Sequence, residues 1–186
     1  MTVTDELDSR FRRAAATEGL LDVGYDAIDS PIGPLLVATT PNGVCRVSFT
    51  TDPAAHLESL ARAFGPRVLR TSAAVEEARR QLDEYFDGGR RDFDLDVDTH
   101  QLPPFAQRVL AELARVPFGE TTSYGALAAR VGAPRAARAV GTVMHRNPVA
   151  IVLPCHRVVG ANGSLTGYAG GLGVKERLLR LEGVLL

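Results

Sequence analysis

Cys155 and His156 stand side by side, directly after an apolar run that ends in Pro154, and an arginine follows them. A thiolate is a strong nucleophile, and a neighbouring base or positive charge raises the fraction of thiol in that form. The chain has only two cysteines and no Cys-x-x-Cys spacing, so a disulfide framework is not indicated. These residues therefore predict a reactive thiol at Cys155.

The chain around this pair must turn for the two side chains to act together. Neighbouring residues on a strand point to opposite faces, so an extended backbone would separate Cys155 from His156. We therefore expect the chain to turn at Pro154.

The elements before this turn have a helical pattern. Phe105, Val109, Leu113 and Val116 recur on one face. Two short helical segments follow at 123–131 and 134–144, separated by Gly132 and Ala133, with Pro134 expected in the first turn of the second helix. A helix pair joined in this way is typical of a helix-turn-helix, although helix pairs in bundles have the same pattern.

The second helix of this pair is unusual for a helix that reads base edges in the major groove. Ala136, Ala137, Ala139, Val140 and Gly141 are small, and the long polar side chains before His145 are those of Arg135 and Arg138. Major-groove readers normally offer several hydrogen-bonding side chains. A slim surface of this kind suits close approach to a DNA backbone or a narrow groove.

The first half of the chain predicts a small α+β domain with an antiparallel sheet. Turn signals at 30–34 and 41–43 separate strand-like runs, and 92–98 alternates strictly, which predicts a half-exposed strand with an acidic outer face. A short amphipathic helix is expected within 1–20, with Leu7, Phe11, Ala14 and Ala15 on its apolar face. The expected strands cover 24–28, 35–39 and 44–49, and the expected helices cover 54–63 and 73–86.

Charge divides the chain at the same place as the structural pattern. Residues 1–100 carry 11 basic and 18 acidic side chains, a net of −7, whereas residues 101–186 carry 10 and 4, a net of +6. The basic half is suited to a polyanion. We expect an extension at 1–21, an α+β domain at 22–100 and a mainly helical domain at 101–186. No apolar run is long enough to span a membrane and the acidic start lacks a signal region, so a cytoplasmic location is expected.

Several motifs of the second half together resemble the O6-alkylguanine-DNA alkyltransferases, which are the methylated-DNA–protein-cysteine methyltransferases. The resemblance is specific over 101–186 and looser over 22–100. The motifs are Pro154-Cys155-His156-Arg157-Val158, Ala137-Arg138-Ala139-Val140-Gly141, Asn147-Pro148, Gly167-Tyr168-Ala169-Gly170-Gly171 and Leu178-Leu179-x-x-Glu182-Gly183.

This resemblance implies DNA repair by direct, single-turnover transfer of an alkyl group from O6-alkylguanine to Cys155, which ends as an irreversible S-alkylcysteine. His156 is similar to the family's base, which acts on the thiol through a water, and Glu182 to the carboxylate that orients it. Asn147 resembles the residue that supports the turn. Tyr124 resembles the tyrosine that hydrogen-bonds the guanine and helps it to leave as a neutral species.

The resemblance also implies how DNA is held. Arg138 is similar to an arginine that enters the base stack from the minor groove and fills the gap left by a base flipped out of the helix. The other residues with implied binding roles are Arg135, Ala137 and Tyr124 on the DNA surface, Val158, Tyr168 and Ala169 in the pocket wall, and Lys175, which ties that wall to the active-site turn.

The expected partner is double-stranded DNA that contains O6-alkylguanine, bound by a monomer, with cooperativity along DNA left open. No cofactor and no membrane partner are expected. Animal members of the family hold zinc in the first domain, but Cys45, His56 and His100 are too few and too scattered for a zinc site, so no metal is expected.

Three other functions compete with this interpretation. A cysteine hydrolase would normally bring its histidine from a distant part of the chain. A protein that binds alkylated lesions without repairing them would lack the cysteine. A helix-turn-helix regulator would read the major groove and would not need the segment around Cys155.

Overall fold

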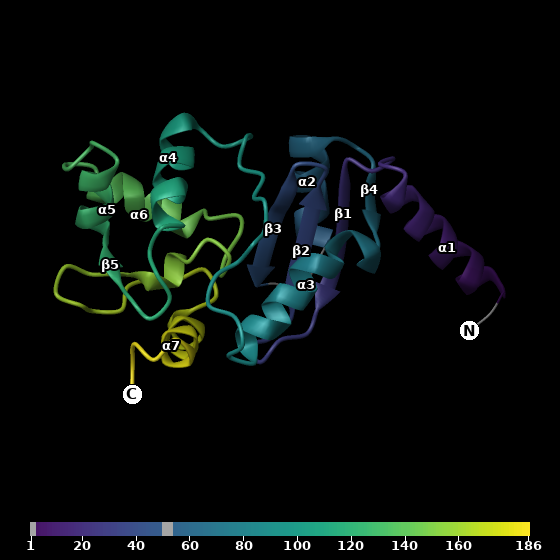
Figure 1. Cartoon of the computed structure of the whole chain (residues 1–186). Helices are drawn as coiled ribbons and strands as arrows, with labels where there is room; N and C mark the ends of the chain where they lie inside the picture. The colour runs from purple at the N-terminus through teal and green to yellow at the C-terminus, as the bar shows by residue number, and fades with distance from the viewer. Residues whose placement is uncertain (1–2, 50–53) are drawn as a thin grey trace. The chain divides into compact units, whose positions relative to one another are not determined.

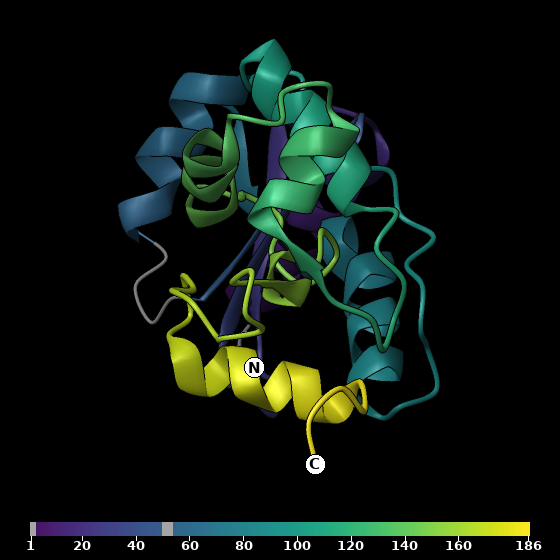
Figure 2. The same ribbon diagram turned by 90° about the vertical axis from the view of Figure 1, so that its left-hand side faces the viewer.

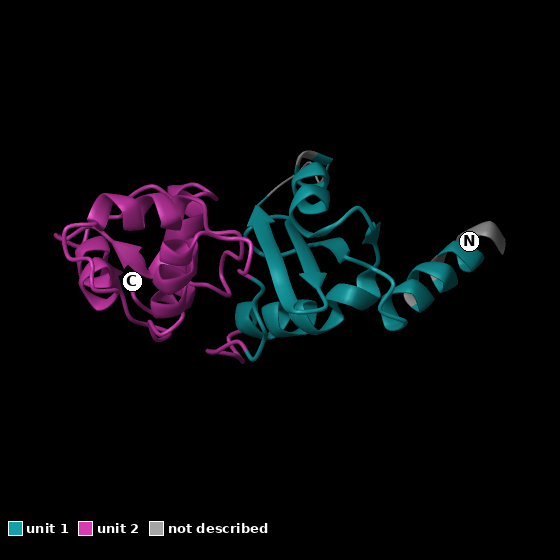
Figure 3. Cartoon of the chain, turned by 90° about the horizontal axis from the view of Figure 1, so that it is seen from above, with its two compact units in different colours: residues 1–87, 94–98 teal, residues 88–93, 99–186 magenta. Residues whose placement is uncertain are grey.

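The computed structural model describes residues 3–49 and 54–186, which form two compact units. The first unit contains the chain up to residue 87 together with 94–98, and the second contains 88–93 and 99–186 (Figure 3). The expected fold class is confirmed: an α/β unit is followed by a mainly helical unit.

The first unit is built on a four-stranded sheet in the order β3-β2-β1-β4 (Figure 1). Its strands are β1 (Val23–Ile28), β2 (Leu35–Thr40), β3 (Gly43–Phe49) and β4 (Val68–Arg70). The first three are antiparallel, as expected, but β4 runs parallel to β1, so the sheet is mixed. The parallel pair arises because α2 (Ala54–Phe64) returns the chain before β4 begins.

Helices cover both faces of this sheet. On one face Leu60 of α2 packs with Val23, Ala38 and Cys45 in a buried cluster. On the other face α3 (Ser72–Phe86) approaches so closely that a Cβ atom at Gly24 would lie 2.3 Å from the Cβ of Ala74. Coverage of both faces explains why β2 is a continuous apolar run rather than an alternating one.

The acidic segment 92–98 is not the strand that its alternation predicts. Its bridge to the sheet is a single parallel pair between Val97 and Val44. The Gln81 side chain instead accepts from the amide of Asp94 at 2.8 Å and donates to the carbonyl of Asp94 at 2.9 Å. Side-chain hydrogen bonds from α3 thus take the place of a strand ladder over part of this segment.

The expected amphipathic helix is α1 (Val3–Thr17), but only part of its apolar face is buried. Ala15 is buried, and α1 packs against α3. Leu7 and Phe11 remain 59% and 66% exposed. The prediction of a helix is therefore confirmed, whereas Leu7 and Phe11 are not packed into the unit.

The second unit contains the helix pair and the segment around Cys155 (Figures 1 and 2). Its elements are α4 (Pro104–Leu113), β5 (Thr122–Ser123), α5 (Tyr124–Arg130), α6 (Ala137–His145), a 3-10 turn (Cys155–Arg157), β6 (Val158–Val159) and α7 (Leu172–Leu181). Helices α4, α5 and α6 contact one another. None of the helices in the described ranges has the length and apolar character needed to cross a membrane.

The helix pair differs from expectation at its junction. The sequence places Pro134 in the first turn of the second helix, but α6 begins at Ala137. Residues 133–136 form a separate turn, closed by a hydrogen bond from the amide of Ala136 to the carbonyl of Ala133 at 2.8 Å. Ser123 caps α5 by accepting from the amide of Ala126 at 3.1 Å, which marks the start of the pair.

Candidate functional site

Cys155 lies at the start of a tight turn. The amide of Cys155 donates to the carbonyl of Leu153 at 2.8 Å, and the amide of Arg157 donates to the carbonyl of Pro154 at 2.9 Å. The turn expected at Pro154 is therefore present. Cys155 is 5% exposed, so its thiol reacts only with a molecule that enters the protein.

The segment before the turn is held in an unusual conformation. Asn147 donates its side-chain amide to the carbonyl of Leu153 at 2.8 Å and accepts from the amide of Val149 at 3.1 Å. Ile151 has a φ of 73°, a left-handed conformation that a β-branched residue rarely adopts. Backbone strain of this kind, on the order of 1–3 kcal/mol, persists where the surrounding structure enforces it. Asn147 is the side chain that encloses this strained loop.

His156 and Glu182 form a buried pair next to the thiol segment. The Nε2 atom of His156 lies 2.8 Å from Oε1 of Glu182. A carboxylate only accepts hydrogen bonds, so Nε2 carries the proton and Nδ1 holds the free lone pair. Nδ1 is buried and makes no hydrogen bond to any of the described residues. The ring is thus oriented with its basic nitrogen available.

Arg157 holds the same carboxylate from the other side. Its Nε and Nη2 atoms donate to the two oxygens of Glu182, each at 2.9 Å, and its Nη1 atom donates to the carbonyl of Val116 at 2.5 Å. This is a bidentate pair, the geometry that fixes a carboxylate most firmly. Arg157 and Glu182 are both buried.

The pKa shifts follow from burial and from this pairing. Burial opposes the charged form of Glu182, but hydrogen bonds from His156 and Arg157 outweigh it and lower the pKa of Glu182 to about 2. Burial lowers the pKa of His156, and Glu182 only partly opposes that shift. The resting pair is therefore a neutral imidazole and a carboxylate.

The thiol itself is not activated at rest. Burial raises the pKa of Cys155, while the nearby side-chain amide of Asn147 and the charge of Lys175 partly oppose the shift. The side chain of Tyr168 has a smaller effect on this pKa in the same direction. A thiolate at this position would therefore need a base to remove the proton.

A polar network ties the loop after β6 to the site. Lys175 is buried and donates its ammonium to the carbonyls of Val158, at 2.6 Å, and Thr166, at 3.2 Å. The hydroxyl of Tyr124 lies 2.7 Å from that of Thr166. The parallel pair of β5 and β6 places Thr122 opposite Val158, so Tyr124, two residues later, starts α5 beside this network.

The arginines expected to face DNA lie apart from this network. Arg135 is exposed in the turn before α6, and Arg138 is exposed on α6, whereas Ala137 is half-buried. Gly141 faces the Tyr124 ring, which a Cβ atom would meet at 3.8 Å. Helix α6 thus connects the exposed arginines with the tyrosine.

The predicted site residues therefore fall into two groups. Asn147, Tyr168 and Lys175 lie around the Cys155 thiol, and His156 and Glu182 form a separate buried pair. Ala169 is exposed on the loop. Sequence reasoning assigned no role to Arg157 or Thr166. The arginine stands within the quoted motif, but its bond to Glu182 depends on how α7 packs.

The residues considered for zinc do not form a site. Cys45 donates to the carbonyl of Ala38 at 3.4 Å, and burial raises its pKa to about 12. Among the residues that the structure describes, no three His, Cys, Asp or Glu side chains cluster as metal ligands would.

Two family profiles match the chain along most of its length. Residues 23–99 match the ribonuclease-like domain of 6-O-methylguanine DNA methyltransferase, and residues 104–184 match its DNA binding domain.

Individual relatives cover the same range. The methylated-DNA–protein-cysteine methyltransferase of Methanosarcina barkeri is 43% identical over 159 residues, which are 85% of this chain and 96% of the relative. That of Mycobacterium leprae is 45% identical over 161 residues, 84% of this chain and 90% of the relative. The crystal structure of Mycobacterium tuberculosis O6-methylguanine methyltransferase superimposes with a TM-score of 0.73 at 42% identity, covering 86% of this chain and 92% of that one. Mycobacterium tuberculosis OGT in complex with DNA gives 0.75 at 41% identity with the same coverage.

Proposed function

Because the chain belongs to the 6-O-methylguanine DNA methyltransferase family, we propose that Cys155 is the residue that accepts the alkyl group. The activity is that of a methylated-DNA–protein-cysteine methyltransferase, which repairs O6-methylguanine in DNA. The observation that carries the assignment to Cys155 is its position: a buried thiol beside a histidine whose orientation is fixed by a buried carboxylate.

The first chemical step is removal of the thiol proton. His156 is neutral at rest, and its Nδ1 lone pair is the base that takes this proton, through a water. The proton then makes His156 an imidazolium, which the carboxylate of Glu182 stabilises. Arg157 keeps Glu182 ionised and in place throughout.

The second step is displacement at the alkyl carbon. The sulfur of Cys155 forms a bond to that carbon while the bond from carbon to guanine O6 breaks, and the electron pair stays with the guanine. Tyr124 donates a proton to the base so that guanine leaves as a neutral molecule. The carbon–sulfur bond of the S-alkylcysteine is stable, because its cleavage would have to expel a thiolate from an unactivated alkyl carbon, so each molecule of protein reacts once.

The base must leave the helix before this chemistry can occur. An atom within stacked DNA is out of reach of a thiol that is only 5% exposed. Arg138 occupies the gap in the stack from the minor groove, while Arg135 and Ala137 contact the adjacent backbone. Val158, Tyr168 and Ala169 form the wall that receives the base, and Lys175 holds that wall.

The remaining parts of the proposal concern partners and location. The partner is double-stranded DNA that contains O6-alkylguanine, and the protein acts as a monomer without a cofactor. Both cysteines among the described residues are free thiols, as expected in a reducing compartment, and this supports a cytoplasmic location.

One experiment tests the central assignment. The protein is mixed with duplex DNA that contains O6-methylguanine, and the tryptic peptide with Cys155 is weighed. We expect one added methyl group on this peptide for each lesion repaired. Cys155→Ser should abolish transfer and retain DNA binding, while Cys45→Ser is the matched control and should transfer normally. Repair without a methylated Cys155 peptide would refute the assignment.

A further inference from the structure

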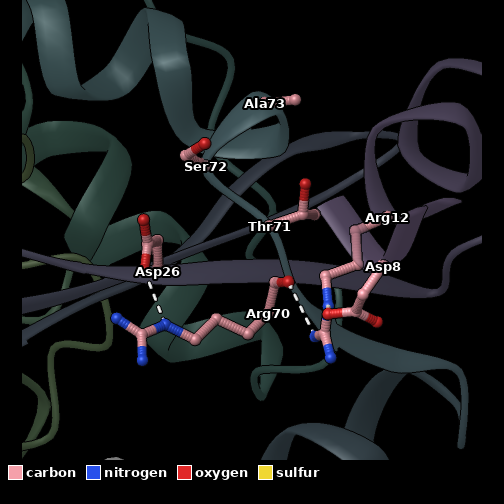
Figure 4. Close-up of a pocket in the computed structure, with 7 residues that line it drawn as sticks. All are labelled: Asp8, Arg12, Asp26, Arg70, Thr71, Ser72 and Ala73. Carbon is pink, nitrogen blue, oxygen red and sulfur yellow. Dashed lines mark hydrogen bonds and ion pairs between the residues drawn. The ribbon is translucent and has the colours of Figure 1, made fainter. Parts of the chain in front are cut away.

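A cavity that does not include the thiol lies in the first unit. Its volume is about 440 Å³, and it opens between α1, the end of β4 and the start of α3 (Figure 4). Asp8 and Arg12 precede the matched family segment, which begins at residue 23, so α1 contributes a wall that the family profiles do not cover. The lining residues are Asp8, Arg12, Asp26, Arg70, Thr71, Ser72 and Ala73.

The start of α3 points hydrogen-bond donors at this cavity. The first amides of any helix have no partner within the helix, and they carry the positive end of its dipole. Here Ser72 and Ala73 of the first turn line the cavity. Thr71, in the capping position, makes no side-chain capping bond to them. The amides of this turn are thus available to an acceptor from outside the helix.

Thr71 gives a second, independent indication that the cavity takes a ligand. Its side chain lines the cavity and is only 7% exposed, yet its hydroxyl has no hydrogen-bond partner among the described residues. Its methyl group lies toward Gly24, where a Cβ atom would be 3.5 Å from it. The hydroxyl of a residue that is this buried is normally bonded. This one is suited to a partner in the cavity.

The charges around the cavity favour an anion. Asp26 is buried and already accepts from Arg70 at 2.8 Å and from Arg79 at 3.2 Å. Asp8 accepts from Nε of Arg12 at 2.6 Å. Within the lining, Arg12 and Arg70 balance Asp8 and Asp26, and Arg79, which pairs with Asp26 from outside the lining, adds one further positive charge.

The two arginines of the lining keep donors that these bonds do not use. Only Nε of Arg70 bonds Asp26 within the described chain, which leaves its terminal N–H groups. Arg12 donates Nη1 to the carbonyl of Arg70 at 3.1 Å, as Figure 4 shows. Its Nη2 group remains for a ligand.

We propose that this cavity binds a phosphate group carried by a small molecule, either free phosphate or a phosphate monoester. Phosphate offers several acceptor oxygens and a double negative charge, which match the helix amides, the hydroxyl and the two guanidinium groups of the lining. The bound group would join Arg12 of α1 to Thr71 at the start of α3. Binding would therefore fasten α1 to the rest of the first unit.

Calorimetric titration of the full chain tests this proposal. Inorganic phosphate and adenosine 5′-monophosphate should bind, and adenosine should not. Tighter binding of the monophosphate would identify an ester as the ligand, and equal binding would identify free phosphate. Phosphate should also slow amide exchange in α1.

Variants connect the binding to these residues. Thr71→Val keeps the shape of the side chain and breaks no hydrogen bond of the ligand-free protein, so its thermal midpoint should not change. Its dissociation constant for phosphate should rise about tenfold, as should that of Arg12→Gln. Arg62→Ala removes another arginine of the first unit from an exposed ion pair with Glu58, and its binding should equal that of the parent protein.

Three results would overturn the proposal. They are the absence of binding at millimolar phosphate, an unchanged dissociation constant in Thr71→Val, and an equal loss in Arg62→Ala. Alkyl transfer by Thr71→Val should be normal, so failure here would leave the assignment of Cys155 untouched.

Discussion

Arg157 is the residue whose contacts add most to the pair of His156 and Glu182. His156 bonds one oxygen of Glu182, and Arg157 bonds both, so the carboxylate cannot rotate without losing several charge-assisted bonds. The motif around Cys155 predicts the cysteine, the histidine and the need for a turn. It could not predict the role of Arg157, because that role depends on where α7 places Glu182.

Replacement of Arg157 should therefore slow alkyl transfer, although Arg157 itself does not touch the guanine. In Arg157→Met the buried carboxylate loses its cation, which typically costs about 3–5 kcal/mol of stability. We expect the single-turnover rate to fall at least tenfold, and Arg157→Lys to recover part of it. Arg180→Met, which breaks an exposed pair with Glu176 on the same helix, is the control. Equal rates in the two methionine variants would contradict this role.

The pKa of Glu182 predicts how stability depends on pH. Its folded pKa of about 2 lies below the ordinary 4.5, so the native state stabilises the ionised form. The resulting stability, on the order of 3 kcal/mol, is fully present above pH 4.5 and is lost as the pH falls toward 2. Urea unfolding at several pH values should show this loss in the parent protein and not in Glu182→Gln. Glu176→Gln should lose stability with falling pH as the parent protein does. The prediction fails if Glu182→Gln also shows this loss.

At the scale of elements, long periodic segments were predictable and short ones were not. Helices α2 and α3 appear where their apolar spacing predicts them. Strand β4 has only three residues, too few for a recognisable pattern, and its pairing with β1 is a long-range choice. The segment 92–98 has the alternation of a strand, but hydrogen bonds with Gln81 decide its conformation.

The contact between this segment and the β2–β3 hairpin requires a glycine at position 43. Its φ is 126°, and a Cβ atom there would lie 2.3 Å from the carbonyl oxygen of Asp96. Gly43→Ala should therefore cost roughly 2–4 kcal/mol, through both backbone strain and displacement of the segment. Gly33, with a φ of 110° and open space where a Cβ atom would lie, is the matched control. Urea unfolding of the two alanine variants should show the larger loss at 43, and equal losses would exclude the steric effect.

Helix α6 should matter only when the substrate is a duplex. Arg138 is exposed on it and lies outside the network around the thiol. Arg138→Ala should slow repair of O6-methylguanine in duplex DNA much more than reaction with free O6-benzylguanine, since the free base needs no extrusion. Single-turnover rates on the two substrates measure the difference. Equal losses on both would contradict insertion into the stack.

At the scale of the whole molecule, the charge division identified the half that faces DNA before any element was placed. The net of +6 belongs to residues 101–186, which contain the matched DNA binding domain, and the net of −7 to residues 1–100. Composition could not reveal the cavity beside Arg12. Its lining comes from α1, β1, β4 and α3, and only the tertiary structure brings them together.

The same division predicts which arginines set the salt dependence of DNA binding. Each phosphate contact that is lost reduces the slope of log K against log salt by about one. Arg135→Ala should reduce this slope, measured by fluorescence anisotropy with undamaged duplex. Arg67→Ala, an exposed arginine of the acidic half, should leave it unchanged. A reduction in the second variant would mean that the acidic half also contacts DNA.

The one lysine of the chain, Lys175, is fully buried beneath the loop that it anchors. Acylating reagents and crosslinkers directed at ε-amines therefore find no side-chain target in the folded molecule. Labelling of Lys175 by an amine-reactive dye ester would therefore report that this loop has opened, and the extent of labelling would measure local unfolding of the protein.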